Sequence, residues 1–184
     1  GVDPSVTTFV FVSPHNWANK DMWAQERQKD NIWKTVRAFD NSDLAAWLEI
    51  APAVARWFAD QIAIPISSLK DIDLFINELS IQYGEINLSP DLIIGGRDAA
   101  YSRLRDWITS DSREVFVEGE SIEESAAFAA AVLKKNLPTE QVQQIANTTV
   151  FIDDEDGVAF LDSMAVDHLI VPLNHRVYRR LKSL

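Results

Sequence analysis

The sequence contains no cysteine, no long apolar run and few basic side chains. Without cysteine the chain forms no disulfide and no thiolate metal site, and this absence is typical of cytoplasmic proteins. No apolar run approaches the roughly 20 residues that cross a bilayer, and no stretch at the start has the pattern of a signal peptide. We therefore expect a cytoplasmic protein without a membrane partner.

The excess of acidic over basic side chains lies mainly in the second part of the chain. Residues 1–65 carry 6 basic and 8 acidic side chains, whereas residues 66–184 carry 11 and 20. An acidic surface repels the phosphate backbone of DNA and RNA, so nucleic-acid binding by this chain alone is disfavoured. One basic cluster near the C-terminal end is interpreted as a solvated helix end. It consists of Arg176, Arg179, Arg180 and Lys182.

With 184 residues and 47% apolar side chains, the chain can form one domain or two small ones. Residues 1–63 predict a β-α-β-α unit. The expected elements are a buried strand Thr7–Val12, a helix Asn19–Lys29, a strand Ile32–Asp40 and a helix capped by Asn41 or Ser42. A further helical piece begins at Pro52, and its i, i+3, i+4 spacing predicts a buried stripe. That stripe consists of Val54, Trp57, Phe58 and Ile62.

The stretch "AIPISS", residues 63–68, is the candidate linker, and residues 69–184 predict a second domain. Its strands and helices alternate, which predicts a mainly parallel sheet flanked by helices. The expected strands are Leu92–Ile94, Glu114–Val117, Thr149–Ile152 and Leu169–Val171. The expected helices are 69–83, 97–108, 122–135, a short one from Pro138, and 156–164.

The segment around Gly119 has the strand–loop–helix order of a phosphate-binding P-loop, G-x-x-x-x-G-K-[ST]. Aligned on Gly119, the second glycine is replaced by Glu124, the lysine by Ser125 and the hydroxyl residue by Ala126. Ser121 and Glu124 instead form the S-x-x-E pattern of a capping box, in which the carboxylate reaches back to the N–H of Ser121. We therefore expect the strand–loop–helix architecture of a nucleotide-binding site without the residues that bind the nucleotide. We also expect no cofactor.

Other candidate catalytic or metal-binding residues lack the companions that their chemistry needs. Asp153 and Asp154 follow a buried strand as a magnesium-binding Walker B carboxylate would, but helix capping explains them equally. A nuclease [D/E]-x-K pair is absent, because no lysine has an acidic residue two positions before it. The isolated histidines are expected to be structural or exposed; they are His15, His168 and His175. We therefore assign no catalytic, cofactor-binding or metal-binding residue.

The six tryptophans fall into two groups. Trp47, Trp57 and Trp107 lie on apolar helix faces and are expected in the core. Trp17, Trp23 and Trp33 surround the first strand–helix–strand unit; they either line a surface groove or pack in a core or between domains, and we favour packing. Two strands do not make a self-sufficient sheet. These side chains therefore need a further surface, which the second part, a second copy or another part of the polypeptide can supply.

Two stretches carry a family resemblance. The stretch "TTFVFVSPHNWANKDMWAQERQKDNIWKTVRAFDNSDLAAWLEIAPAVARWF" resembles the later half of a restriction-endonuclease-like region in large bacterial proteins. The stretches "LIIGGRDAAYSRLRDWI", "EVFVEGESIEES", "TVFIDD" and "HLIVPLNHR" follow the order of a STAND-type P-loop NTPase. Residues that match the NTPase pattern are Gly96, Arg97, Gly119, Asp153 and Asp154.

The resemblance implies that this chain is a fragment of a larger bacterial protein. One option for that protein is a role in defence against foreign DNA. The favoured hypothesis is a non-catalytic scaffold, sensor or interaction segment, with a protein partner or other parts of the same polypeptide bound to it. The sequence leaves open whether the chain forms a homo-oligomer. The alternative is part of an active Mg-dependent nucleotide-hydrolysing enzyme or nuclease, which takes its missing residues from outside this chain.

Overall fold

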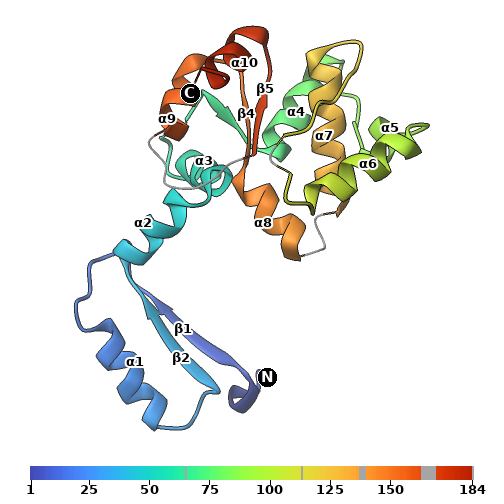
Figure 1. Cartoon of the computed structure of the whole chain (residues 1–184). Coiled ribbons are helices and arrows are strands. Elements are labelled where there is room, and N and C mark those ends of the chain that lie inside the picture. Colours follow the sequence, from blue (N-terminus) through green and yellow to red (C-terminus); the bar gives the residue numbers. More distant parts are fainter. Residues whose placement is uncertain (65, 113, 137–139, 163–168, 184) are drawn as a thin grey trace. The chain divides into compact units, whose positions relative to one another are not determined.

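The computed structural model describes residues 1–64, 66–112, 114–136, 140–162 and 169–183. Its internal contacts divide the chain into two units, Gly1–Glu49 and Ile50–Leu184 (Figure 1). Both units are mixed α/β, each with helices around a small sheet. Among the described residues, no helix is both long and apolar enough to span a membrane.

The first unit contains a parallel pair of strands. A 3-10 turn, Pro4–Val6, precedes β1, and the further elements follow in the predicted β-α-β-α order. They are β1 (Thr8–Val12), α1 (Lys20–Lys29), β2 (Thr35–Phe39) and α2 (Asn41–Glu49). Thr8 pairs with Thr35 and Val12 with Phe39, and α1 provides the crossover that parallel strands need.

Aromatic side chains fill the space between β1 and α1. The ring centroids of Phe11 and Trp23 are 5.4 Å apart, and those of Phe11 and Trp17 are 5.6 Å apart. Phe9 contacts Trp33 at 5.2 Å. These tryptophans therefore pack on other rings within the unit, and each is half-buried, so none of them is a core residue.

The expectation of a buried first strand is wrong. Val10 and Val12 are 48% and 49% exposed, and Phe11 is 42% exposed. The side chains of a strand alternate between the two faces of the sheet, and α1 covers only the face of Phe9 and Phe11. No layer of the first unit covers Val10 and Val12 on the other face.

A mixed sheet forms the centre of the second unit. Its strands are β3 (Leu69–Lys70), β4 (Thr149–Ile152) and β5 (Leu169–Pro172), in the order β3-β4-β5. β4 runs antiparallel to β3 and parallel to β5. β4 and β5 were predicted, whereas the stretch expected as one helix over residues 69–83 divides into β3 and a helix. The sheet is smaller and less parallel than the sequence predicts.

Helices cover both faces of this sheet. They are α3 (Pro52–Gln61), α4 (Ile72–Gln82), α5 (Pro90–Ile94), α6 (Asp98–Ile108), α7 (Ile122–Asn136), α8 (Glu140–Thr148), α9 (Glu155–Asp162) and α10 (His175–Leu181). Val150 and Ile152 pack with residues of α3, α9 and α10. Phe151 points to the opposite face, where its ring stacks on Phe75 of α4 with centroids 4.4 Å apart. Burial of a side chain such as Phe151 contributes about 2–3 kcal/mol.

Two predicted strands are absent. Leu92–Ile94 lies in α5, because the Ser89 hydroxyl accepts from Leu92 N at 3.3 Å and Pro90 occupies the first turn. Residues 114–117 have no strand partner, and Phe116 is 75% exposed. The apolar, β-branched composition of both stretches was therefore overridden, in the first case by a capped helix start.

The predicted buried face of α3 is also wrong. Trp57, Phe58 and Ile62 are 54%, 42% and 50% exposed. The buried side chains of α3 are Pro52, Ala53, Arg56 and Ala59. Arg56 donates to Asp71 at 2.6 Å and also pairs with Asp60, and these ion pairs turn this side of the helix inward.

The boundary between the units differs from the expected one. Residues 52–61 were assigned to the first part, but α3 packs against α8, β3 and β4 of the second unit. The expected start of a short helix at Pro138 and the expected end of a helix at Met164 lie outside the described residues. Trp47 of α2 contacts Phe39 at 4.6 Å but is 45% exposed, so neither it nor Trp57 is a core residue.

This boundary predicts where a protease cuts first. Glu49 and Ile50 are exposed, whereas Leu69 is fully buried in the second unit. We expect limited proteolysis to cleave first near residues 49–51 and to leave a stable fragment that begins at about residue 50. Mass spectrometry of the early fragments identifies the site. First cleavage within residues 63–69 would place the boundary at the linker instead.

Candidate functional site

The loop before α7 is where the sequence places a degenerate nucleotide site. The Ser121 hydroxyl accepts from Glu124 N at 3.0 Å, as the capping box predicts. Glu124 Oε2 accepts from Glu120 N at 2.7 Å, so the carboxylate reaches one residue further back than Ser121. The two bonds satisfy backbone donors that a helix start otherwise leaves free for an anion.

Arg97 also contacts this loop, residues 119–124, which we call the closed loop because the chain's own side chains bind its backbone donors. It lies before α6 and forms an ion pair with Glu124 Oε1, and its guanidinium lies 5.8 Å from the ring centroid of Phe128. The N–H of Glu120 lowers the pKa of Glu124, and Arg97 lowers it further. Glu124 is therefore ionised at neutral pH, and its carboxylate holds the place of a bound anion.

Gly119 lies directly against these side chains, so a larger residue there would displace them. A Cβ at this position would lie 2.7 Å from Ser125 Oγ and 3.1 Å from Glu124 Oε2. In a phosphate-binding loop a glycine lets the backbone approach the ligand closely. Here the space beside the glycine is filled by the chain's own oxygen atoms.

The remaining P-loop positions have structural roles. The Ser125 hydroxyl donates to Ser121 O at 3.0 Å, and Ala126 is buried in the core. No basic side chain occupies the position of the P-loop lysine. The loop therefore lacks the group that would contact the terminal phosphates.

The two aspartates after β4 are also used structurally. Asp154 Oδ1 accepts from Gly157 N at 2.9 Å, which is the capping bond of α9. Asp153 forms an ion pair with Lys70 at 2.7 Å, and Lys70 also pairs with Glu78 at 2.8 Å. Within the described ranges, no group of three or more His, Asp or Glu side chains could hold a metal ion.

A cavity of about 1040 Å³ lies beside the closed loop. Its wall is formed by α6, α7, α10, β5 and residues 114–122, and it is mainly apolar. Trp107 lines it, and the indole Nε1 of Trp107 is buried without a hydrogen-bond partner in the described part of the chain. Lys182 pairs with Glu114 at its edge. The cavity separates residues 114–118 from the open edge of β5.

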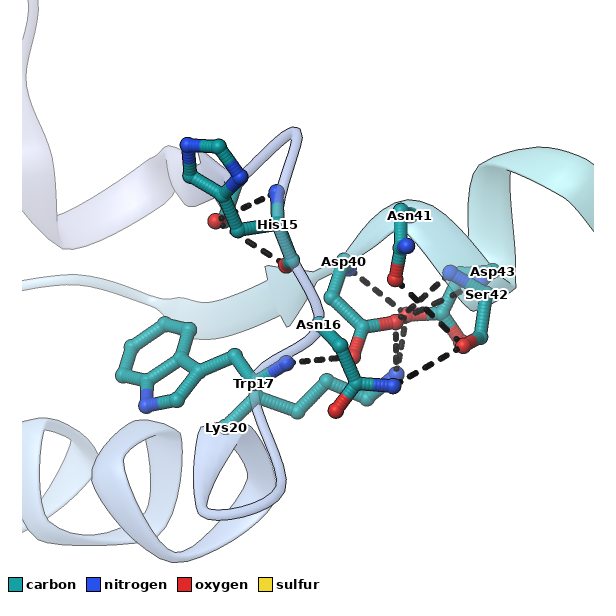
Figure 2. A network of polar contacts seen from close by, with 9 residues as sticks. His15, Asn16, Trp17, Lys20, Asp40, Asn41, Ser42 and Asp43 are labelled. Carbon is teal, nitrogen blue, oxygen red and sulfur yellow. Dashed lines mark hydrogen bonds and ion pairs between the residues drawn. The ribbon is translucent and has the colours of Figure 1, made fainter.

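The first unit contains a polar network that the sequence reasoning did not identify (Figure 2). It lies where β1 and β2 end, and its centre is Asp40, which is 3% exposed. Asp40 accepts from Trp17 N at 2.9 Å, from Lys20 Nζ at 2.8 Å and from Ser42 N at 3.1 Å. Asp43 accepts from Asp40 N at 2.9 Å and also pairs with Lys20.

These bonds show that Asp40, rather than Asn41 or Ser42, caps α2. The hydrogen bond from Lys20 and the N–H of Trp17 hold the pKa of Asp40 well below its ordinary range. Both carboxylate oxygens of Asp40 accept hydrogen bonds from the chain itself, so the network links the loop after β1 to the start of α2. A sequence signal existed, because Asp40 follows a strand and begins D-N-S-D, but its partners Trp17 and Lys20 lie 23 and 20 residues away in the sequence.

The histidines do not join either cluster. His15 is exposed, and its ring points away from Asp40 (Figure 2). His175 is exposed at the start of α10, and His168 lies outside the described residues. In the basic cluster Arg176 pairs with Glu155 at 2.6 Å, consistent with an ordinary helix end. No family model, curated protein or solved structure matches the chain.

The Asp40 network predicts an acid-sensitive first unit. A carboxyl with a lowered pKa stabilises the fold above its unfolded pKa of about 4, and this contribution is lost as the pH falls through the folded value. Asp40→Asn removes it, so we expect the first unit to melt several degrees lower at pH 7. We also expect a weaker dependence of stability on pH below about 4.

Tryptophan fluorescence during thermal unfolding measures both effects, since Trp17 and Trp23 lie in this unit. Glu26→Gln, on the exposed side of α1, is the matched control and should behave as the wild type. Equal stability of Asp40→Asn and the wild type at pH 7 would show that the network does not stabilise the unit.

Proposed function

We propose that the chain is a non-catalytic scaffold or interaction segment whose second unit has the helix start of a nucleotide-binding loop but closes it with Glu124. The observation that carries the proposal is the bond from Glu120 N to Glu124 Oε2 at 2.7 Å. A phosphate would have to displace this carboxylate and its ion pair with Arg97.

Electrostatics around the loop support the same proposal. Glu120 and Glu123 are close to Glu124 in sequence, and a phosphate charge about 4 Å from one carboxylate is repelled by roughly 1 kcal/mol in water and by more in a cleft. Ser125 stands at the lysine position, so the loop has no lysine of its own, and the nearby guanidinium of Arg97 is already paired with Glu124. Binding of a nucleoside triphosphate is therefore disfavoured both by the occupied donors and by charge.

An exposed apolar surface supports a role in protein interactions. Trp57 and Phe58 of α3 and Ile62 just after its end are each at least 42% exposed, whereas Arg56 of the same helix is buried. Large exposed aromatic and aliphatic side chains that gather on one helix face are typical of binding surfaces. The exposed face of α3 is thus the proposed interaction surface of the second unit.

Titration calorimetry with ATP and magnesium tests the non-catalytic role. We expect no binding by the wild type, and none by Ser125→Lys, because Glu124 still occupies the loop. The double variant Glu124→Gly, Ser125→Lys frees the donor of Glu120 and supplies the cation, so it should bind more tightly than either parent. Circular dichroism checks that each variant is folded.

Two results would contradict the proposal. One is a wild-type dissociation constant below about 100 μM, which corresponds to roughly −5.5 kcal/mol of binding free energy. The other is a clear gain of affinity from Ser125→Lys alone, which would show that the loop accepts phosphate with Glu124 in place. Either result would favour an active nucleotide-dependent enzyme.

A further inference from the structure

The first unit lacks the burial that a stable domain needs. Among residues 1–49, all of which the structure describes, Val36 and Ala38 are the only buried apolar side chains. The sheet consists of β1 and β2 alone, and two-stranded sheets are marginally stable in water. A further strand would supply both hydrogen bonds and burial.

Only β1 has an edge that can accept this strand. At the outer edge of β2, Gln28 of α1 accepts from Val36 N at 2.8 Å and donates to Trp33 O at 3.3 Å, so α1 obstructs this edge. α1 lies beside β2, whereas β1 forms the other edge of the pair (Figure 1). The free edge is therefore that of β1.

The backbone groups at this edge follow from the pairing. Ser13 N donates to Phe39 O at 2.9 Å, so Ser13 faces β2. Alternate residues of a strand direct their N–H and C=O groups to opposite edges. Phe9 and Phe11 therefore bond to β2, whereas Thr8, Val10 and Val12 direct their groups outward. This edge carries none of the charged residues or prolines that protect edge strands.

The sequence of β1 allows two copies of this strand to pair with each other. Residues 4–14, "PSVTTFVFVSP", contain no charged side chain, so two copies bring no like charges together. In an antiparallel pair with Val10 opposite Val10, Thr8 lies opposite Val12 and each such pair exchanges hydrogen bonds in both directions. Phe9 then lies opposite Phe11 on the face that α1 covers, and aromatic cross-strand pairs are stabilising.

We propose that two copies of the chain associate through antiparallel pairing of β1 with β1 about a two-fold axis at Val10. The product is one continuous sheet that contains β1 and β2 of both copies, and a two-fold interface of this kind uses the same surface twice. The paired edges protect the N–H and C=O groups of Thr8, Val10 and Val12 from water. This inference does not depend on the closed loop of the second unit, so each can fail alone.

Sedimentation velocity of the full chain over a range of concentrations tests the proposal. The wild type should dimerise. Val10→Lys and Val10→Glu each place like charges opposite each other at the axis, so each variant alone should lose the dimer at concentrations where the wild type forms it. An equimolar mixture of the two variants places Lys opposite Glu and should restore dimers. Val10 is half exposed, so both variants should fold, which circular dichroism verifies.

Met22→Lys is the matched control, because Met22 of α1 is 57% exposed in the same unit and lies outside the proposed interface. It should dimerise as the wild type does. A monomeric wild type, dimers that survive in either Val10 variant alone, or a mixture that stays monomeric would each overturn the proposed pairing.

Discussion

Backbone N–H groups at helix starts need acceptors, and this chain supplies them from its own side chains. Asp40 caps α2, Asp71 accepts from Leu74 N at 2.8 Å, and Asp154 caps α9. Ser121 and Glu124 do the same before α7. These bonds fix the loops before α2, α4, α7 and α9, whereas α1, α3 and α6 begin without a side-chain cap bond.

The need for acceptors at helix starts also affects where a ligand can bind. In α/β proteins, ligands bind beyond the carboxyl ends of parallel strands, where helix starts attract anions. Asp40 and Asp154 follow the carboxyl ends of β2 and β4, whereas the loop of Glu124 before α7 follows residues 114–117, which form no strand. Each carboxylate accepts from a backbone N–H group near a helix start, and such groups can otherwise bind an anion. The acidic composition of the chain is thus partly explained by internal capping.

The sequence predicted what depends on local pattern. The strands β1, β2, β4 and β5, and helices such as α7, arise from short-range periodicity and capping signals, and their positions agree within a few residues. The capping role of Ser121 was also predictable, because its partner is three residues away. The reach of Glu124 to Glu120 N, and not to Ser121 N, depends on the loop's actual conformation.

What depends on distant contacts was missed. The inward face of α3 is set by Arg56 and its bond to Asp71, which overrides the apolar stripe of Trp57. Asp40 meets Lys20 across a parallel crossover, and no local spacing reveals that contact. Residues 114–117 have strand composition, yet β5 is separated from them by the cavity. Tertiary packing decides such cases, because propensities are small beside burial and ion pairing.

The occupancy of Glu120 N by the Glu124 carboxylate is the central claim, and nuclear magnetic resonance can observe it directly. The account predicts that the amide proton shift of Glu120 follows the titration of Glu124, with a midpoint below the ordinary value of about 4.3, because the pKa of Glu124 is lowered. At neutral pH, added inorganic phosphate should leave that amide unmoved. An amide that ignores the titration, or one that shifts when phosphate is added, would contradict the account.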